Sequence, residues 1–239
     1  MDPLQTDPLQ QFKQAAAEFA VGLVESGMVV GLGTGSTAKL AVEALGKRVQ
    51  DGLRIVGVPT SEYTARQARG VGIRISSLAE HAEIDLTIDG ADEIQRGTLD
   101  LIKGGGGALL REKVIASSSR RLIIIADESK LVDWLGAHFA VPVEVVQFEW
   151  QATERKLKKL GAQTTLRPGP GSQGPNDRPF VTDSGNFIVD CSFSQIAAPA
   201  ELDQQLNSVV GVVEHGLFLK MTSQAIVAGR DGVKVLLPQ

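Results

Sequence analysis

A repeated alternation of short apolar runs with amphipathic segments, extending to Asp127, is the feature that most constrains the fold. The runs MVVGL, RIVGV, GIRI, IDLTI, LDLIK and RLIIIAD predict strands. Between them, apolar residues at helical spacing predict helices at 9–26, ended by Gly27, and at 37–49, 61–69 and 108–117. Strand and helix in turn indicate an α/β fold: a Rossmann-like, mostly parallel sheet with helices on both faces.

The pattern changes past Trp134 and predicts a second, smaller α+β domain. Its order is strand, helix, strand, strand, helix, strand, with strands at VPVEVV, AQTTLR, NFIVDCSF and VVEHGLF and helices at 153–160 and 200–206. This is the split βαβ order of a ferredoxin-like domain. The closing segment QAIVAGRDGVKVLL predicts two strands around a GRDG turn, which return to the edge of the first sheet.

These patterns set the predicted domain bounds. Residues 1–135 and 216–239 make the Rossmann-like domain, and residues 136–215 make the small domain. Within the small domain, residues 167–179 read RPGPGSQGPNDRP. This composition cannot pack a core, so it indicates a loop or hairpin insertion, to which we assign no function.

Charge and hydropathy exclude several classes of partner. The net charge is −4 and no run of Lys and Arg makes a basic patch, so nucleic acid is not an expected partner. No apolar run approaches the roughly 18 residues that cross a bilayer, so no membrane partner is expected. The first residues, MDPLQTDPLQQ, have the features of neither a signal peptide nor a transit peptide, and we expect a cytoplasmic protein.

The turn after the first predicted strand has the composition of a phosphate-binding loop. It reads GLGTGSTA over residues 31–38. Such a turn offers backbone N–H groups and the positive end of a helix dipole, and Thr34, Ser36 and Thr37 add hydroxyls. Glycines at the first, third and fifth positions do not fit the dinucleotide fingerprint, and no Lys precedes Ser36 as in Walker A. A turn that binds nothing is the alternative.

Acidic residues crowd the turn after another buried strand. In DLTIDGADE, residues 85–93, Asp89, Asp92 and Glu93 follow the apolar strand. In open parallel sheets ligands lie outside the carboxyl ends of the strands, so these side chains are candidates for reactive carboxylates. A polar turn in which Asp92 caps a helix is the alternative.

A third segment, KGGGGALLREKVIA at residues 103–116, places a Lys and four glycines before a helix. Four glycines are costly to order, which favours close ligand approach over a purely structural turn. Lys103 can donate to negative charge that develops on oxygen, and Glu112 can exchange protons with a carbon atom if it faces a cleft. A solvated helix face is the alternative for Glu112, which has Arg111 and Lys113 as neighbours.

No metal site or nucleophilic catalyst is indicated by the remaining residues. His81, His138 and His215 lack metal-ligand spacing, and one cysteine cannot complete the usual zinc site. No Ser lies in a nucleophile-elbow context. Cys191, the only cysteine, cannot form an internal disulfide and is expected to be an inert buried thiol in a strand.

Taken together, GLGTGSTA, TIDGADE and KGGGGALLREK resemble, in this order, the motifs of the ribose-5-phosphate isomerase A family. The joint match is more specific than any one segment. PTSEYTARQA, IADESKLVDWLG and VPVEVV extend the resemblance over almost the entire chain. The N-terminal extension and the 167–179 insertion depart from the family, and neither carries a motif.

The resemblance implies a set of site residues, none of which is substituted. The proton-transferring glutamate falls on Glu112, and the other catalytic positions on Asp89, Asp92 and Lys103. A substrate-contacting Lys falls on Lys130, which by sequence alone is a surface residue near a helix start. The implied substrate-binding positions are Thr34, Gly35, Ser36, Thr37, Asp89, Gly90, Ala91, Asp92, Lys103, Gly104, Gly105, Gly106 and Lys130.

The resemblance also implies a reaction, the interconversion of ribose 5-phosphate and ribulose 5-phosphate without metal or cofactor. After the furanose ring opens, Glu112 removes the proton on the second carbon and returns it to the first through an enediolate. Asp89 assists proton movement at oxygen, Lys103 stabilises the oxyanion, and Asp92 holds Lys103 or a sugar hydroxyl. The resemblance further implies a homodimer or homotetramer, and leaves open whether the enzyme serves the pentose phosphate pathway, carbon fixation or both.

Two other functions compete with this interpretation, because a fold does not fix a function. A non-catalytic sugar-phosphate sensor is disfavoured by the lack of a helix-turn-helix segment and of a basic face, and would not need Glu112 together with Lys103. An acyl-CoA transferase on a similar sheet is weakened because the glutamate lies in a sugar-isomerase motif.

Overall fold

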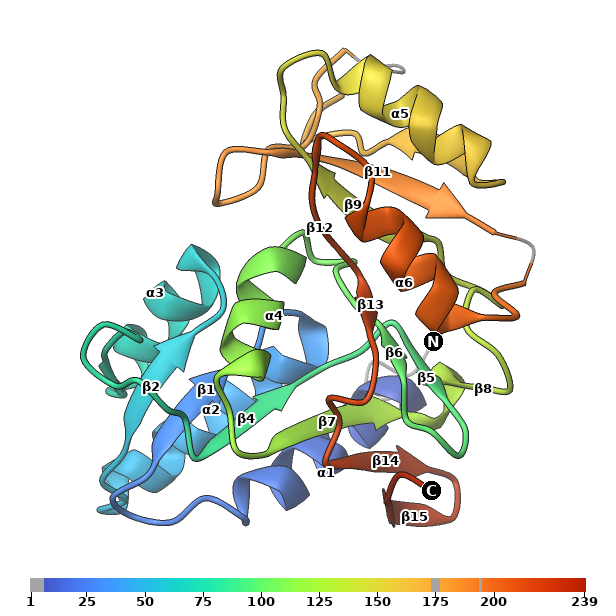
Figure 1. Ribbon diagram of the computed structural model, residues 1–239. Coiled ribbons are helices and arrows are strands. Elements are labelled where there is room, and N and C mark those ends of the chain that lie inside the picture. The colour runs from blue at the N-terminus through green and yellow to red at the C-terminus, as the bar shows by residue number, and fades with distance from the viewer. Residues whose placement is uncertain (1–6, 173–176, 194) are drawn as a thin grey trace, which may run out of the picture.

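The computed structural model describes residues 7–172, 177–193 and 195–239 (Figure 1). Its largest sheet has seven strands in the order β15-β14-β7-β4-β1-β2-β3. Neighbouring strands are parallel except for β15, which pairs antiparallel with β14. The mostly parallel sheet and the closing hairpin at its edge are therefore confirmed. The strands are β1 (Val29–Leu32), β2 (Val56–Pro59), β3 (Arg74–Ile75), β4 (Leu86–Asp89), β7 (Leu122–Asp127), β14 (Gln224–Gly229) and β15 (Gly232–Leu236).

The strand order creates a switch point between β1 and β4. From β1 the chain moves outward through β2 and β3, and then returns to the opposite side of β1 as β4. Because the connections diverge on the two sides of this point, the loops after β1 and β4 leave a crevice at the carboxyl edge of the sheet. These two loops are the GLGTGSTA and TIDGADE segments.

Helices α1 (Pro8–Val21) and α2 (Ser36–Gln50) cover one face of this sheet, and α4 (Leu109–Ser117) lies on the other, as predicted (Figure 1). The alternation along β7 shows this division: Ile123 and Ile125 join the core beneath α1 and α2, whereas Leu122 and Ile124 pack on the opposite face. Helix α3 (Glu62–Gly70) connects β2 and β3. Over the described ranges, none of the helices is long and apolar enough to span a bilayer.

Helix α1 is shorter than predicted, because it ends at Val21 and not at Ser26. The carbonyl oxygens of Val21 and Val24 both accept from the guanidinium of Arg48 on α2. The side chain of a distant residue thus satisfies backbone groups that would otherwise favour continuation of the helix.

The small domain has a four-stranded antiparallel sheet in the order β10-β11-β9-β12, which is the predicted ferredoxin-like arrangement. Cys191 is buried in its core, as expected. Pro168 pairs with Pro179, so the described part of the insertion is a hairpin; residues 173–176 lie outside the described ranges. The elements are β9 (Val141–Val145), α5 (Trp150–Lys159), β10 (Gln163–Leu166), β11 (Phe187–Ser192), α6 (Pro199–Asn207) and β12 (Val212–His215).

A third sheet, in the order β13-β6-β5-β8, was not predicted. LDLIK contributes β6 to this sheet and not to the parallel one, so that assignment was wrong. VVEHGLF is not one strand but divides at Gly216, where a Cβ atom would lie 2.2 Å from the carbonyl oxygen of Lys103. The strands are β5 (Glu93–Gln95), β6 (Leu101–Ile102), β8 (Leu131–Val132), which follows the short 3₁₀ helix η1 (Glu128–Lys130), and β13 (Leu217–Phe218).

Candidate active site

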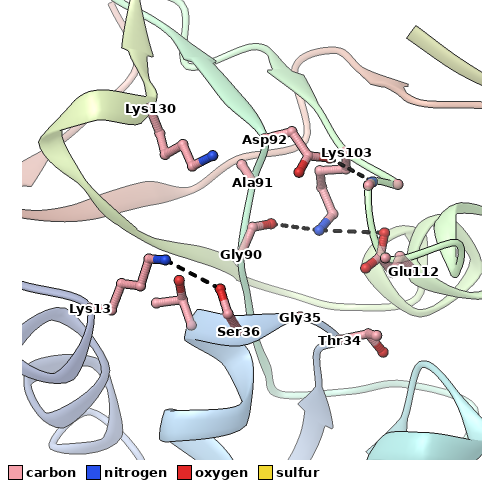
Figure 2. Close-up of a pocket in the computed structure, with 14 residues that line it drawn as sticks. Lys13, Thr34, Gly35, Ser36, Gly90, Ala91, Asp92, Lys103, Glu112 and Lys130 are labelled. Atoms are coloured by element: carbon pink, nitrogen blue, oxygen red, sulfur yellow. Dashed lines mark hydrogen bonds and ion pairs between the residues drawn. The ribbon is translucent and has the colours of Figure 1, made fainter. Parts of the chain in front are cut away.

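A pocket lies at the switch point, above the carboxyl ends of β1 and β4 (Figure 2). It brings together every predicted site residue except Asp89, which does not line it. The Asp89 side chain is buried directly behind Lys103. The lining residues are Lys13, Thr34, Gly35, Ser36, Thr37, Gly90, Ala91, Asp92, Lys103, Gly104, Gly105, Gly106, Glu112 and Lys130.

The turn between β1 and α2 owes its shape to two glycines. A Cβ atom on Gly33 would lie 2.2 Å from Oδ1 of Asp89, so only glycine lets β1 end this close to the acidic loop. Gly35 has φ 120°, in the region that favours glycine, and immediately precedes α2. Since Gly35 has no side chain to cap the helix, the first N–H groups of α2 and the positive end of its dipole remain available to an anion.

Thr34 lines the pocket, and its hydroxyl is in contact with three neighbouring hydroxyls. It lies 2.7 Å from the hydroxyl of Thr60, 2.8 Å from that of Ser61 and 3.1 Å from that of Thr64. The backbone N–H of Thr34 donates to Asp89 Oδ1 at 3.1 Å. Thr34 therefore fixes the turn against α3 and β4, and Ser36 and Thr37 are left as the hydroxyl donors of the turn.

Lys13 is a pocket residue that the sequence reasoning missed. Its Nζ lies 3.5 Å from Oγ of Ser36, and Figure 2 shows Lys13 and Lys130 on the same side of the pocket. Next to Phe12 on an amphipathic helix, Lys13 looks like an ordinary solvated residue, and only the packing of α1 beside α2 brings it to the site. Two ammonium groups and a helix N-terminus thus surround one end of the pocket.

At the other end, Lys103 is held in a buried polar cluster (Figure 2). Its Nζ donates to the carbonyl oxygen of Gly90 at 2.6 Å, and lies 2.9 Å from Oδ2 of Asp89 and 3.6 Å from Oε2 of Glu112. The side chains of Lys103 and Glu112 are each only 3% exposed. The solvated-face alternative for Glu112 is therefore wrong. The buried ammonium of Lys103 is tolerated because it is hydrogen-bonded to Gly90 and paired with Asp89, whereas Oε2 of Glu112 has no hydrogen-bond partner among the described residues.

Burial and charge together set the protonation of this cluster. Burial, aided by the negative charges of Asp89 and Asp92, raises the pKa of Glu112 to about 8, although the Lys103 ammonium opposes the change. Burial disfavours the charged form of Lys103, but the neighbouring carboxylates outweigh it and raise the pKa of Lys103. Burial also raises the pKa of Asp89, against Lys103 and two backbone N–H groups that favour its ionised form. Glu112 is thus a carboxyl group that exchanges a proton near neutral pH.

Asp92 and Glu93 have different roles although they are neighbours. Asp92 Oδ2 accepts the N–H of Gly105 at 2.7 Å, so Asp92 fixes the glycine segment and the helix-cap alternative is wrong. Glu93 is 1% exposed and accepts the backbone N–H groups of Gly136, His138 and Phe139. Its carboxylate organises a loop and does not reach the pocket.

No metal-binding cluster is found in the part of the chain that the structure describes, since no three or more His, Cys, Asp and Glu side chains are grouped to hold an ion. His215, for example, is fully buried, and its Nδ1 accepts the N–H of Leu217 at 3.3 Å.

Comparison with known sequences identifies relatives along nearly the full length of the chain. Residues 56–232 match the family described as ribose 5-phosphate isomerase A (phosphoriboisomerase A). Ribose-5-phosphate isomerase A of Gloeobacter violaceus is 56% identical over 230 residues, which cover 96% of this chain and 97% of that protein. The protein of the same name from Thermomicrobium roseum is 51% identical over 227 residues, with 95% and 94% covered.

Solved structures agree with the sequences. Ribose 5-phosphate isomerase A from Methanocaldococcus jannaschii superposes with a TM-score of 0.90 at 39% identity, covering 95% of this chain and 99% of that one. A D-ribose-5-phosphate isomerase in complex with phospho-erythronic acid gives a TM-score of 0.91 at 40% identity, with 96% and 99% covered. The matches in sequence and in fold each extend over nearly the whole chain, and the present chain belongs to the ribose-5-phosphate isomerase A family.

Proposed function

We propose that the protein interconverts D-ribose 5-phosphate and D-ribulose 5-phosphate through an enediolate, with Glu112 as the base. The observation that carries the proposal is the buried Glu112 carboxyl beside the Lys103 ammonium, at one end of a pocket whose other end is cationic. A base and a donor for an oxyanion, placed opposite an anion site, are the groups that isomerisation of a phosphorylated sugar requires. The sensor alternative leaves unexplained the costly burial of an ammonium group beside an ionisable carboxyl group.

The phosphate group is assigned to the end formed by Lys13, Lys130 and the start of α2. The hydroxyls of Ser36 and Thr37 and the first N–H groups of α2 supply donors, and the two ammonium groups balance a dianion. Binding there orients the sugar, so that its aldehyde end extends toward Lys103 and Glu112. This orientation supplies the proximity on which the proton transfer depends.

The proton transfer follows from the cluster at the other end. In the open-chain aldose, the ionised Glu112 removes the proton on the second carbon, and the electron pair forms the double bond of the enediolate while negative charge moves to the first oxygen. Lys103 donates to that oxygen, a contribution of about 3 to 4 kcal/mol for a preorganised donor. Glu112 then returns the proton to the first carbon, and the hydroxyl proton of the second carbon passes to the first oxygen, which completes the ketose.

Asp89 and Asp92 are assigned to holding other site residues in place during this step. Because Asp89 does not line the pocket, we assign it to holding Lys103 charged and oriented, and its effect on proton movement at the sugar oxygens is exerted through Lys103. Asp92 is assigned to the glycine segment that it already binds. Asp89→Asn and Lys103→Ala with isomerase rates near that of the wild type would contradict this division.

We further propose the organisation in which the enzyme works. Residues 1–135 with 216–239 form the catalytic domain and 136–215 the small domain, a division supported by the separate sheets. The small domain carries Phe148, 82% exposed, and Val210, 78% exposed, which favour it as the contact surface of a homodimer or homotetramer. We place the enzyme in the cytoplasm and in the non-oxidative pentose phosphate pathway or the Calvin cycle.

The test measures conversion of ribose 5-phosphate to ribulose 5-phosphate by the purified protein in EDTA. We expect turnover by the wild type, loss of turnover by Glu112→Gln, and normal turnover by Glu43→Gln, a matched control whose side chain is 44% exposed. Wild-type protein that is folded and binds ribose 5-phosphate without converting it would contradict the proposal and favour the sensor function.

A further inference from the structure

The β10–β11 hairpin reaches from the small domain to the glycine segment of the active site through Arg167. This residue follows β10, and its guanidinium forms a fork with Asp190 of β11, in which Nε donates to Oδ2 at 2.9 Å and Nη2 donates to Oδ1. The remaining nitrogen, Nη1, lies 2.7 Å from the carbonyl oxygen of Gly104 and 3.3 Å from that of Gly105. The Arg167 side chain is 13% exposed, so this contact is partly shielded from water.

The backbone of Arg167 is fixed as firmly as its side chain. Its N–H donates to the carbonyl oxygen of Ile188 at 2.8 Å, and its own carbonyl oxygen accepts the N–H of Phe180 at 2.8 Å. Because the backbone of Arg167 and its guanidinium group are both already hydrogen-bonded, the side chain loses little conformational freedom when it binds the two carbonyl groups. Arg167 is therefore a preorganised donor directed at the glycine segment.

The peptide units of the glycine segment are held from opposite sides. The carbonyl oxygen of Gly104 accepts from Arg167, whereas the N–H of the same trans peptide, on Gly105, donates to Asp92 Oδ2 at 2.7 Å. In the next peptide the carbonyl oxygen of Gly105 is directed toward Arg167. Because a trans peptide places its N–H opposite its carbonyl group, the N–H of Gly106 points away from Arg167, and Gly106 itself lines the pocket.

We propose that Arg167 is a positioning residue of the isomerase, which holds the carbonyl groups of Gly104 and Gly105 so that the N–H of Gly106 is directed at a sugar oxygen. Consecutive glycines have more backbone freedom to lose than other residues, and the segment needs an external anchor to keep one orientation. Asp92 supplies the anchor from the pocket side and Arg167 supplies it from the small domain. The assignment rests on the proposed function, because it needs the sugar phosphate in the pocket.

The experiment compares steady-state kinetics of ribose 5-phosphate isomerisation by the full chain and its variants. The main variant is Arg167→Lys, which keeps the charge but cannot bind Asp190 and both carbonyl groups at once. The matched control is Arg48→Lys, because Nη1 of Arg48 also donates to two backbone carbonyl groups, those of Val21 and Val24, away from the pocket. We expect kcat of Arg167→Lys to fall by about 10- to 100-fold with KM changed less than about threefold, and the control to keep both constants.

Two further variants separate positioning from stability. Asp190→Asn keeps Arg167 but weakens the pair of hydrogen bonds between the two side chains. We expect kcat to fall, as in Arg167→Lys, and the effects of the two substitutions not to add in the double variant. For Arg167→Ala, methylguanidine in the assay is expected to restore part of the lost kcat, whereas it would not repair a merely destabilised protein.

Each result bears on the assignment. A normal kcat in folded Arg167→Lys, an equal loss in Arg48→Lys, or no rescue of Arg167→Ala by methylguanidine would overturn it. The wild type reports separately on the reaction itself: if it fails to convert ribose 5-phosphate, the proposed function fails and the assignment falls with it, whereas an active wild type with unaffected variants refutes the role of Arg167 alone.

Discussion

Replacing Glu112 by Gln is predicted to stabilise the folded protein at pH 9 and to leave its stability nearly unchanged at pH 4. Gln matches the neutral carboxyl group in shape and carries no charge. At pH 4 the wild-type side chain is also mostly neutral, in the folded and the unfolded protein alike. At pH 9 the wild type must keep a carboxylate inside the protein, because the pKa of Glu112 is about 8 in the folded state.

The size of the effect follows from proton linkage. Between the ordinary value of 4.5 and about 8, the unfolded chain has released the Glu112 proton while the folded protein keeps it. Stability from this group is therefore fully present below pH 4.5 and is lost as the pH rises through 8. Each pKa unit corresponds to about 1.36 kcal/mol, so the difference amounts to about 5 kcal/mol. This is a large part of the free energy of unfolding of a typical domain, about 5 to 15 kcal/mol.

The assay is urea unfolding of wild type and Glu112→Gln at pH 4, 6 and 9, followed by fluorescence of the two tryptophans. Groups that titrate elsewhere cancel in the difference between the two proteins. Glu43→Gln serves as the control, because a half-exposed side chain should change stability by less than about 0.5 kcal/mol at every pH. An advantage of Glu112→Gln that is the same at pH 4 and pH 9 would refute the argument that burial holds this carboxyl group protonated.

Three further predictions concern catalysis and the shape of the pocket. The kcat/KM for ribose 5-phosphate should rise with pH and level off above about 8, as Glu112 ionises in the free enzyme, and a flat profile from pH 6 to 9 would contradict its role as the base. Lys13→Met should raise KM for ribose 5-phosphate by about 10- to 100-fold, which is the loss expected for one charge-assisted hydrogen bond, with little change in kcat. An unchanged KM would contradict the assignment of Lys13 to phosphate binding. Gly33→Ala should lower both the Tm and kcat, because its Cβ would lie 2.2 Å from Asp89 Oδ1, whereas Gly70→Ala, with no atom within 4 Å of the added Cβ, should be close to wild type in melting and rate measurements.

The parts of the structure that followed from the sequence are those that depend on local pattern. The apolar runs ending in Leu32 and Ile88 are strands, and their polar turns meet at one edge of the sheet. The third sheet could not be predicted in this way, because β5, β6, β8 and β13 are only two or three residues long. Runs this short show no periodicity, and their pairing depends on segments far apart in the chain.

The site residues likewise divide into those that belong to local sequence motifs and those that only the packing of the fold brings to the site. Ser36 was singled out because a glycine-rich turn before a helix has recognisable chemistry, and Glu112 was assigned as the base because its segment resembles a family motif. Lys13 and Arg167 belong to no such motif, and each reaches the pocket or its glycine segment through packing between distant elements. The direction of the Thr34 hydroxyl likewise depends on α3, which supplies its partners Ser61 and Thr64 only after the domain has folded.

The junction at Gly216 has a consequence for biosynthesis. Its carbonyl oxygen accepts the N–H of Lys103 at 2.9 Å, and its N–H donates to the carbonyl oxygen of Pro142 at 2.7 Å, so one residue distant in sequence from both is bonded to Lys103 and to the small domain. Just beyond it, β14 fills the place beside β7 in the main sheet. A ribosome translates these residues after β1, β2, β3, β4 and β7, and until they emerge the nascent chain presents β7 as an unpaired edge. Completion of the pocket around Lys103 and protection of the β7 edge from misassembly therefore both depend on one segment that is translated after the residues it joins.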